Sequence, residues 1–150
     1  MNLSYFLNLK SLEELTAYLN DVYIAAISKL NNGSKRILIV LPTDAGKTTM
    51  LLRIAKEITP EQGEGAFFIT GFVLQTKQMQ MKLDKELPNA KAITFYELQR
   101  DSFEQLKDSK YLFVDDLFFR DRRELMRVLK DYQGIVIAMS GTGDQEVMGR

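Results

Sequence analysis

The sequence predicts an α/β fold, a three-layer sandwich in which helices flank a mostly parallel, five-stranded sheet. Two observations lead to this prediction. Short runs of β-branched and other apolar residues alternate along the chain with longer segments whose apolar residues recur at helical spacing. The length of 150 residues suits a single domain with a substantial core, in which right-handed crossovers connect the strands.

The first predicted element is a long amphipathic helix. The capping box Ser11-Leu12-Glu13-Glu14 begins it, and its apolar residues continue at helical spacing to Leu30. The helix should end at Asn31-Asn32-Gly33. We therefore expect residues 1–34 to form an N-terminal helical segment that packs on a core made by residues 35–150.

The remaining elements follow from apolar runs and from the residues that interrupt them. Apolar runs rich in β-branched and aromatic residues predict strands at residues 36–40, 66–70, 91–95, 111–114 and 135–139. Segments with helical spacing predict helices at residues 47–58, 73–87, 96–105 and 121–130. Pro60 and Pro88 end two of these helices, residues 60–65 form a glycine-rich loop, Asp121 caps the last helix and Gly134 follows it.

The composition restricts the chemistry that the chain can perform. Cysteine and histidine are absent, which excludes disulfides, thiolate zinc sites and catalysis by either residue type. Acidic and basic residues balance at 20 each, so any contact with DNA or RNA must come from a local basic patch. No apolar run approaches the length of a membrane span and the N-terminus does not resemble a signal peptide. We expect a cytoplasmic protein without a membrane segment.

A phosphate-binding loop is predicted between the first strand and the second helix. The sequence Leu41-Pro42-Thr43-Asp44-Ala45-Gly46-Lys47-Thr48 gives the order strand, loop, helix that is typical of a P-loop. Backbone N–H groups of such a loop and the positive end of its helix surround a triphosphate, which predicts binding of ATP or GTP. We expect Lys47 to reach the terminal phosphates and Thr48 to hold Mg²⁺. The predicted nucleotide contacts are Thr43, Asp44, Ala45, Gly46, Lys47, Thr48 and Thr49.

Two residues of this loop differ from the usual pattern. Leu41 stands where the first glycine is usual, and Asp44 stands where many such loops have glycine. A carboxylate about 5 Å from a phosphate charge would cost up to ~3 kcal/mol at an effective dielectric constant of 20, and far less if it faced water. The alternative interpretation is an ordinary strand-to-helix turn, in which Thr43 or Asp44 caps the helix.

Polar residues follow the last two predicted strands. Asp115 and Asp116 come at the end of the apolar run 111–114, and the carboxyl ends of parallel strands form the edge where ligands bind. We expect Asp115 to hold Mg²⁺ and Asp116, at a position where hydrolytic P-loop enzymes usually carry Glu, to activate water. Ser140 is the third catalytic candidate beside Lys47 and Asp116, as a sensor of the γ-phosphate. The alternative is that Asp115 and Asp116 are solvated acids at the end of a strand and that Ser140 begins an ordinary turn.

Two groups of basic residues are candidates for a nucleic-acid contact, with a solvated helix face as the alternative. One group lies in the predicted helix 73–87 and contains Lys77, Lys82 and Lys85. The other contains Arg120, Arg122, Arg123, Arg127 and Lys130.

In the order of these parts, the chain resembles the first RecA-like lobe of superfamily-2 helicases and translocases. Residues 41–48 are similar to motif I of that family, Val114-Asp115-Asp116 to motif II, and Met139-Ser140-Gly141-Thr142 to motif III. Tyr23-Ile24-Ala25-Ala26-Ile27 lies where the family has a Tyr-Gln-x-x-Ala helix, with Ile24 at the position of the adenine-reading Gln. The resemblance implies a P-loop NTPase of RecA-like fold that uses ATP and Mg²⁺ in nucleic-acid metabolism.

The resemblance also implies a missing part. A helicase of this family closes ATP between two lobes, and the second lobe supplies an arginine that stabilises the transition state; this chain ends before any such lobe. We expect slow hydrolysis by the isolated chain, and a protein partner, another copy or a further segment that completes the site. Loss of such an arginine slows phosphoryl transfer by about 10³ to 10⁵.

Three other interpretations fit parts of the sequence. An AAA+-type helicase loader is similar around Asp115-Asp116-Leu117, although it would normally add a helical lid. A thymidine-kinase-like enzyme is similar over residues 46–53, although it should also have a zinc-held loop, which a chain without cysteine cannot form. A degenerate P-loop protein that binds a partner without hydrolysis is the third, and Asp44, Ile24 and Asp116 favour it.

Overall fold

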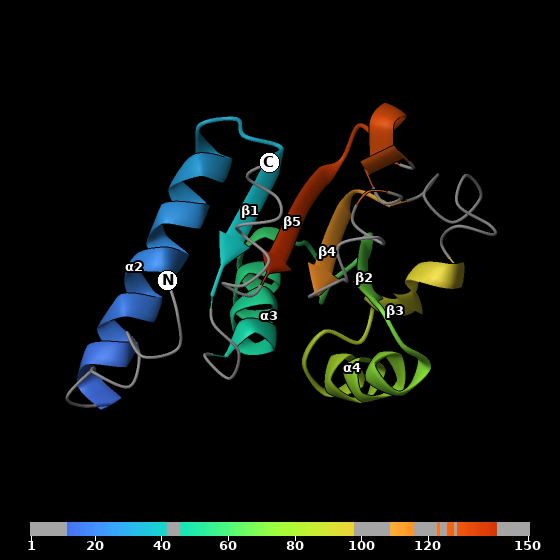
Figure 1. Cartoon of the computed structure of the whole chain (residues 1–150), viewed down its shortest axis with the longest axis horizontal. Helices are drawn as coiled ribbons and strands as arrows, with labels where there is room; N and C mark the ends of the chain where they lie inside the picture. Colours follow the sequence, from blue (N-terminus) through green and yellow to red (C-terminus); the bar gives the residue numbers. More distant parts are fainter. Residues whose placement is uncertain are drawn as a thin grey trace.

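The computed structural model of the chain describes residues 12–41, 46–97, 109–115, 123, 126–127 and 129–140. In chain order its helices and strands are α2 (Leu12–Asn31), β1 (Arg36–Val40), α3 (Lys47–Ile58), β2 (Ala66–Thr70), α4 (Val73–Glu86), β3 (Lys91–Thr94), β4 (Tyr111–Asp115), the 3₁₀ turn η1 (Leu129–Asp131) and β5 (Ile135–Ser140). The strands form one five-stranded sheet in the order β1-β5-β4-β2-β3, and every neighbouring pair is parallel. The predicted α/β fold with a sheet flanked by helices is confirmed (Figure 1).

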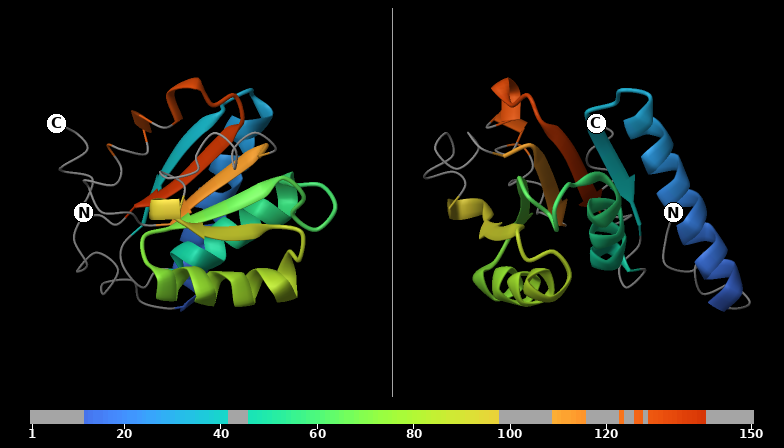
Figure 2. Two further views of the ribbon diagram at one scale, coloured as in Figure 1. Left: turned by 90° about the vertical axis from the view of Figure 1, so that its right-hand side faces the viewer. Right: turned by 180° about the vertical axis from the view of Figure 1, so that it is seen from behind.

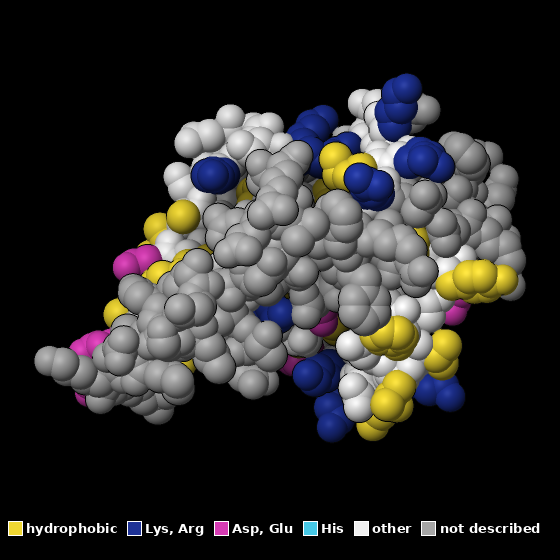
Figure 3. Space-filling view, viewed as in Figure 1, with side chains coloured by type: hydrophobic (Ala, Val, Ile, Leu, Met, Phe, Trp, Pro, Cys, Tyr) yellow, Lys and Arg dark blue, Asp and Glu magenta, His cyan; other side chains and the backbone are white. Residues whose placement is uncertain are grey.

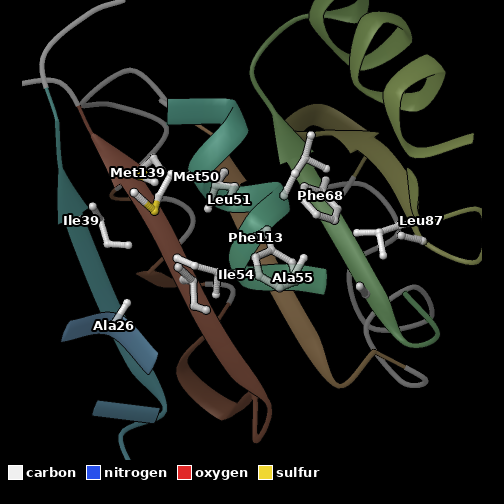
Figure 4. Close-up of a cluster of buried hydrophobic side chains, with 14 of the residues drawn as sticks. Ala26, Ile39, Met50, Leu51, Ile54, Ala55, Phe68, Leu87, Phe113 and Met139 are labelled. Carbon is white, nitrogen blue, oxygen red and sulfur yellow. The ribbon is translucent and has the colours of Figure 1, made fainter. Parts of the chain in front are cut away.

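The helices α2, α3 and α4 pack against the same face of the sheet (Figure 2). α3 crosses β4 and β5, α4 covers β2 and β3, and α2 lies beside β1 and α3. On this face of the sheet, the rings of Phe68 in β2 and Phe113 in β4 stack with their centroids 4.7 Å apart. Figure 4 shows Leu51, Ile54 and Ala55 of α3 directed into the same cluster.

The opposite face of the sheet carries a second apolar cluster. The strands place alternate residues there because successive side chains point to opposite faces. Leu129 of η1 is buried in this cluster together with residues of four strands, namely Ile69, Ile93, Leu112, Val114 and Val136. Both faces of the central strands are therefore covered, as the apolar runs predict for parallel strands.

Five predicted boundaries differ from those of the structure. The strands predicted over 111–114 and 135–139 each continue one residue further, to Asp115 and Ser140. The helix predicted over 73–87 ends at Glu86. The strand predicted to reach Phe95 ends at Thr94, because the Thr94 hydroxyl accepts a hydrogen bond from the backbone N–H of Glu97 at 3.0 Å and caps a helical turn over residues 95–97. The helix predicted through Lys130 finishes instead as the 3₁₀ turn Leu129–Asp131. The rest of the helix predicted at 96–105 lies outside the described residues.

Side chains at the amino ends of the strands hold the sheet together opposite the predicted ligand edge. Arg36, the first residue of β1, donates to the carbonyl of Tyr132 at 2.6 Å and lies over its ring. The Tyr132 hydroxyl is 3.0 Å from the hydroxyl of Ser109, which precedes β4. Burial raises the pKa of the Tyr132 hydroxyl above its usual value, against smaller opposing effects of Ser109 and Arg36.

Candidate functional site

The loop predicted to bind phosphate connects β1 to α3 at the carboxyl edge of the sheet. Leu41 is fully buried, and its N–H donates to the carbonyl of Ser140 at 2.9 Å, which extends the pairing of β1 with β5 by one residue. Gly46 then precedes α3 in the left-handed conformation, with φ 87° and ψ 38°. Among the described residues, a Cβ at Gly46 would meet no atom within 4 Å, and the left-handed backbone conformation is what favours glycine there.

The two predicted Mg²⁺ ligands meet at this edge. Thr48 lies in the first turn of α3, and its hydroxyl donates to the Asp115 carboxylate at 3.1 Å. Asp115 is the last residue of β4, so the bond joins residues 67 positions apart in the sequence. β5 separates β1 from β4 in the sheet, and α3, which packs across β4 and β5, brings Thr48 to the end of β4.

The hydroxyl and carboxylate suit Mg²⁺ by chemistry and by spacing. Both are hard oxygen donors, and ligands on adjacent corners of an octahedron with bonds of about 2.05 Å lie about 2.9 Å apart. The observed separation of 3.1 Å between Thr48 Oγ1 and Asp115 Oδ2 is close to that value. Among the residues that the structure describes, no three Asp or Glu side chains gather as a metal site. Mg²⁺ commonly takes one or two ligands from the protein, with phosphates and water supplying the others.

Ser140 lies beside this pair, at the end of the strand between β1 and β4. It is 1% exposed and pairs in register with Val40, while its neighbour Met139 pairs with Asp115. Ser140 is thus a buried residue at the end of the strand between β1, which precedes the predicted phosphate-binding loop, and β4, which ends at Asp115.

The other predicted site residues divide into two groups. Lys47 and Thr48 are half-buried at the start of α3, and Thr49 is exposed. Four predicted residues lie outside the described part of the chain, namely Thr43, Asp44, Ala45 and Asp116. The predicted site residues that the structure describes therefore lie at one edge of the sheet. They come from the start of α3 and from the ends of β4 and β5.

Sequence reasoning missed two hydroxyls at the same edge. Thr70 ends β2 and Thr94 ends β3, and both are buried. The Thr70 hydroxyl bonds to that of Thr76 in α4, and Thr94 caps residues 95–97. Their position at the end of an apolar run is the sequence signal that could have predicted them. The hydrogen bonds that both hydroxyls make are to neighbouring residues of the fold.

The predicted basic groups are exposed where they are described. Lys77, Lys82 and Lys85 lie on the surface of α4, where Lys82 and Lys85 line a shallow hollow of about 300 Å³. Of the second group, Arg123, Arg127 and Lys130 are exposed, and Arg120 and Arg122 lie outside the described residues.

Comparison with known families gives one assignment. The family described as the type III restriction enzyme, res subunit (ResIII), matches residues 12–139, which is most of the chain. The chain belongs to the ResIII family. ResIII membership agrees with the P-loop, helicase-like fold described above, and this family membership implies nucleotide binding. No helix in the described part of this ResIII chain is both long and apolar enough to cross a membrane.

Other comparisons add little. The comparison with curated protein sequences found no match to the ResIII chain. The solved structure of SulA from Pseudomonas aeruginosa is similar with a TM-score of 0.45 and 15% sequence identity, over 72% of this chain and 98% of that one.

Proposed function

We propose that this ResIII chain is a Mg²⁺-dependent ATPase of the helicase or translocase first-lobe type that acts in nucleic-acid metabolism. The observation that carries the proposal is the 3.1 Å contact between Thr48 and Asp115. It joins the first turn of α3, directly after Gly46, to the acid at the end of β4, which is the pairing that P-loop NTPases use to hold Mg²⁺.

Each site residue has a role in this proposal. The N–H groups at the start of α3, from Gly46 to Thr49, would face the phosphates, with the positive end of the helix behind them. Lys47 would place its ammonium against the terminal phosphates, and Thr48 and Asp115 would hold Mg²⁺. The bound metal would neutralise charge on the β- and γ-phosphate oxygens.

The hydrolytic part of the proposal rests on Asp116 and Ser140. Asp116 would orient and deprotonate the attacking water, and its side chain is one methylene shorter than the usual Glu, so the water must approach more closely or a second water must bridge. Ser140 would sense the γ-phosphate from the end of β5. An arginine from a second lobe, a partner or another copy would complete the site.

Nucleotide binding is tested by titrating a fluorescent ATP analogue into the purified chain with Mg²⁺ and with EDTA. We expect Mg²⁺-dependent binding that Lys47→Ala weakens at least about tenfold, since a charge-assisted contact to phosphate is removed. Lys91→Ala, at an exposed position on β3, is the matched control and should bind like the parent chain. Equal weak binding by the parent chain and Lys47→Ala would refute the phosphate-loop assignment.

Hydrolysis measurements separate this function from the other interpretations. ATP turnover that rises with single-stranded DNA or RNA supports the translocase type, whereas turnover that requires a nucleoside indicates a kinase. Stimulation that requires a partner helicase would indicate an AAA+-like loader. An increase in turnover for Asp116→Glu supports a weakened enzyme; no change, with binding intact, favours a P-loop protein that binds without hydrolysis.

The binding-only alternative has one structural observation in its favour. Ile24 of α2 stands where superfamily-2 helicases, which the chain resembles, have the Gln that reads adenine, and it is 61% exposed. An apolar side chain there cannot hydrogen-bond the base, so adenine selectivity would need another contact. Comparing ATP and GTP affinities of the parent chain and of Ile24→Gln tests this directly; tighter ATP binding by the variant would show that the position faces the base.

A further inference from the structure

Two helices at opposite ends of the sheet present exposed faces of opposite charge. α2 lies beside β1 and α4 covers β2 and β3, with α3 between them (Figures 1 and 2). On each helix the side away from the core holds a row of four exposed residues. The acidic row of α2 is Glu13, Ala17, Asp21 and Ile24, and the basic row of α4 is Lys85, Met81, Lys77 and Leu74.

The two rows have the same spacing when one is read backwards. The acidic row advances by four, four and three residues from position 13, and the basic row descends by four, four and three from position 85. Because an α-helix rises 1.5 Å per residue, the two charges of each row lie about 12 Å apart along the helix axis. Antiparallel docking of the helices therefore brings four pairs opposite one another at once, which are Glu13 with Lys85, Ala17 with Met81, Asp21 with Lys77, and Ile24 with Leu74.

The charges of both rows are available for such a contact. In the described part of the chain, no ion pair or hydrogen bond is formed by the side chains of Glu13, Asp21, Lys77 or Lys85. The acids of α4 are already partnered, because Asp84 accepts a hydrogen bond from Gln80 at 3.0 Å and Glu86 pairs with Lys56 of α3. The exposed face of α4 is thus basic, although the chain as a whole is neutral.

The apolar members of the rows lie unusually far out of the core. Ile24 is 61% exposed, Met81 65% and Leu74 67%. In Figure 3 hydrophobic side chains lie among Lys and Arg side chains over α4, while acidic side chains border α2 at the other end of the molecule. Nucleic acid would match the lysines alone, whereas an acidic helix with an exposed isoleucine matches both the lysines and the apolar side chains.

We propose that a second copy of this chain docks the acidic row of its α2 on the basic row of α4. The two rows of one molecule lie at opposite ends of the sheet with α3 between them, so the contact forms between molecules. It is heterologous, head to tail, and each added copy leaves one row open at either end. Such a contact closes into a ring or continues as a filament, depending on the rotation between neighbours. The proposal does not depend on nucleotide binding.

The test is sedimentation velocity of the purified chain over a range of concentrations, at about 50 mM and about 500 mM salt. We expect reversible association at low salt that weakens at high salt, since the paired charges are exposed and screened. Lys77→Glu with Lys85→Glu should weaken association roughly ten- to thirtyfold, and so should Glu13→Lys with Asp21→Lys. An equimolar mixture of the two double variants restores opposite charges across every contact and should associate like the parent chain.

A matched control separates the rows from net charge. Lys91→Glu with Lys110→Glu makes the same change of net charge at exposed positions outside both rows and should leave association unchanged. Circular dichroism and thermal unfolding establish that each variant is folded. A parent chain that stays monomeric at low salt overturns the proposal, as does failure of the mixture to associate. Loss of single-stranded DNA binding in the Lys77 and Lys85 variant, with self-association intact, would overturn it in favour of a nucleic-acid surface.

Discussion

The bond between Thr48 and Asp115 can be tested by a double-mutant cycle in the absence of nucleotide. Thr48→Val replaces the hydroxyl with a methyl group of similar size, and Asp115→Leu removes the charge and both acceptor oxygens at a similar side-chain size. If the hydroxyl donates to the carboxylate at 3.1 Å in solution, the two substitutions must interact energetically.

The expected size follows from the surroundings of the bond. A hydrogen bond to a charged group contributes about 1.5–3 kcal/mol when it is buried. Thr48 and Asp115 are both only partly buried, so solvent screening reduces this and we expect a coupling free energy of about 1 kcal/mol. For a chain of this length such a change moves the midpoint of thermal unfolding by about 2–4 °C.

The assay is urea unfolding of the parent chain, both single variants and the double variant, followed by titration of a fluorescent ATP analogue with Mg²⁺. Thr48→Ser, which keeps the hydroxyl, is the control and should retain most of the coupling and the binding. We expect each single variant to lose at least about tenfold in Mg²⁺-dependent affinity, as disruption of metal sites commonly does. A coupling energy of zero would refute the contact, and unchanged Mg²⁺-dependent binding would refute the metal assignment.

Three further predictions concern the scaffold. Gly134→Ala should lower stability by about 1–3 kcal/mol in urea unfolding, because a Cβ there would clash with the Tyr132 hydroxyl and lie 2.7 Å from the backbone carbonyl oxygen of Lys110; an unchanged midpoint would contradict this packing. The free energy of unfolding should fall above about pH 10, because folding raises the pKa of the Tyr132 hydroxyl. The stabilisation from this hydroxyl is complete below its pKa in the unfolded chain and is lost as the pH rises through its pKa in the folded chain. Tyr132→Phe should lack this part of the loss, and identical pH profiles for the two proteins would contradict the prediction. Phe113→Ala should cost about 3–5 kcal/mol, since it removes the fully buried ring stacked on Phe68, and a loss below about 1 kcal/mol would mean that the core rearranges freely.

Local patterns in the sequence were sufficient for most of the elements. β1, α3 and β2 have the predicted bounds, because each is a strongly periodic or continuously apolar segment next to Gly or Pro. The errors at Phe95 and at Leu129–Asp131 have a different origin. Apolar character does not say whether a buried residue ends a strand or begins a turn, and in the first case the Thr94 cap decided the outcome.

The residues of the candidate site could be predicted one by one, but not which of them lie close together in the fold. Lys47 and Thr48 come from a loop motif, and Asp115 and Ser140 from the polar ends of apolar runs. Which strand ends would lie near the loop depends on the order of strands in the sheet, and strand order is a property of long-range pairing that no local pattern specifies.

The sequence by itself determined the alternation of strands and helices, the loop before α3 and the balance of charge, since these depend on local periodicity and residue type. The tertiary structure alone decided that β5 lies between β1 and β4, that Thr48 meets Asp115, and that the acidic row of α2 and the basic row of α4 lie at opposite ends of the sheet. The physical reason is the burial of the central strands on both faces: the packing of α2, α3 and α4 on one face brings together side chains that the chain keeps far apart.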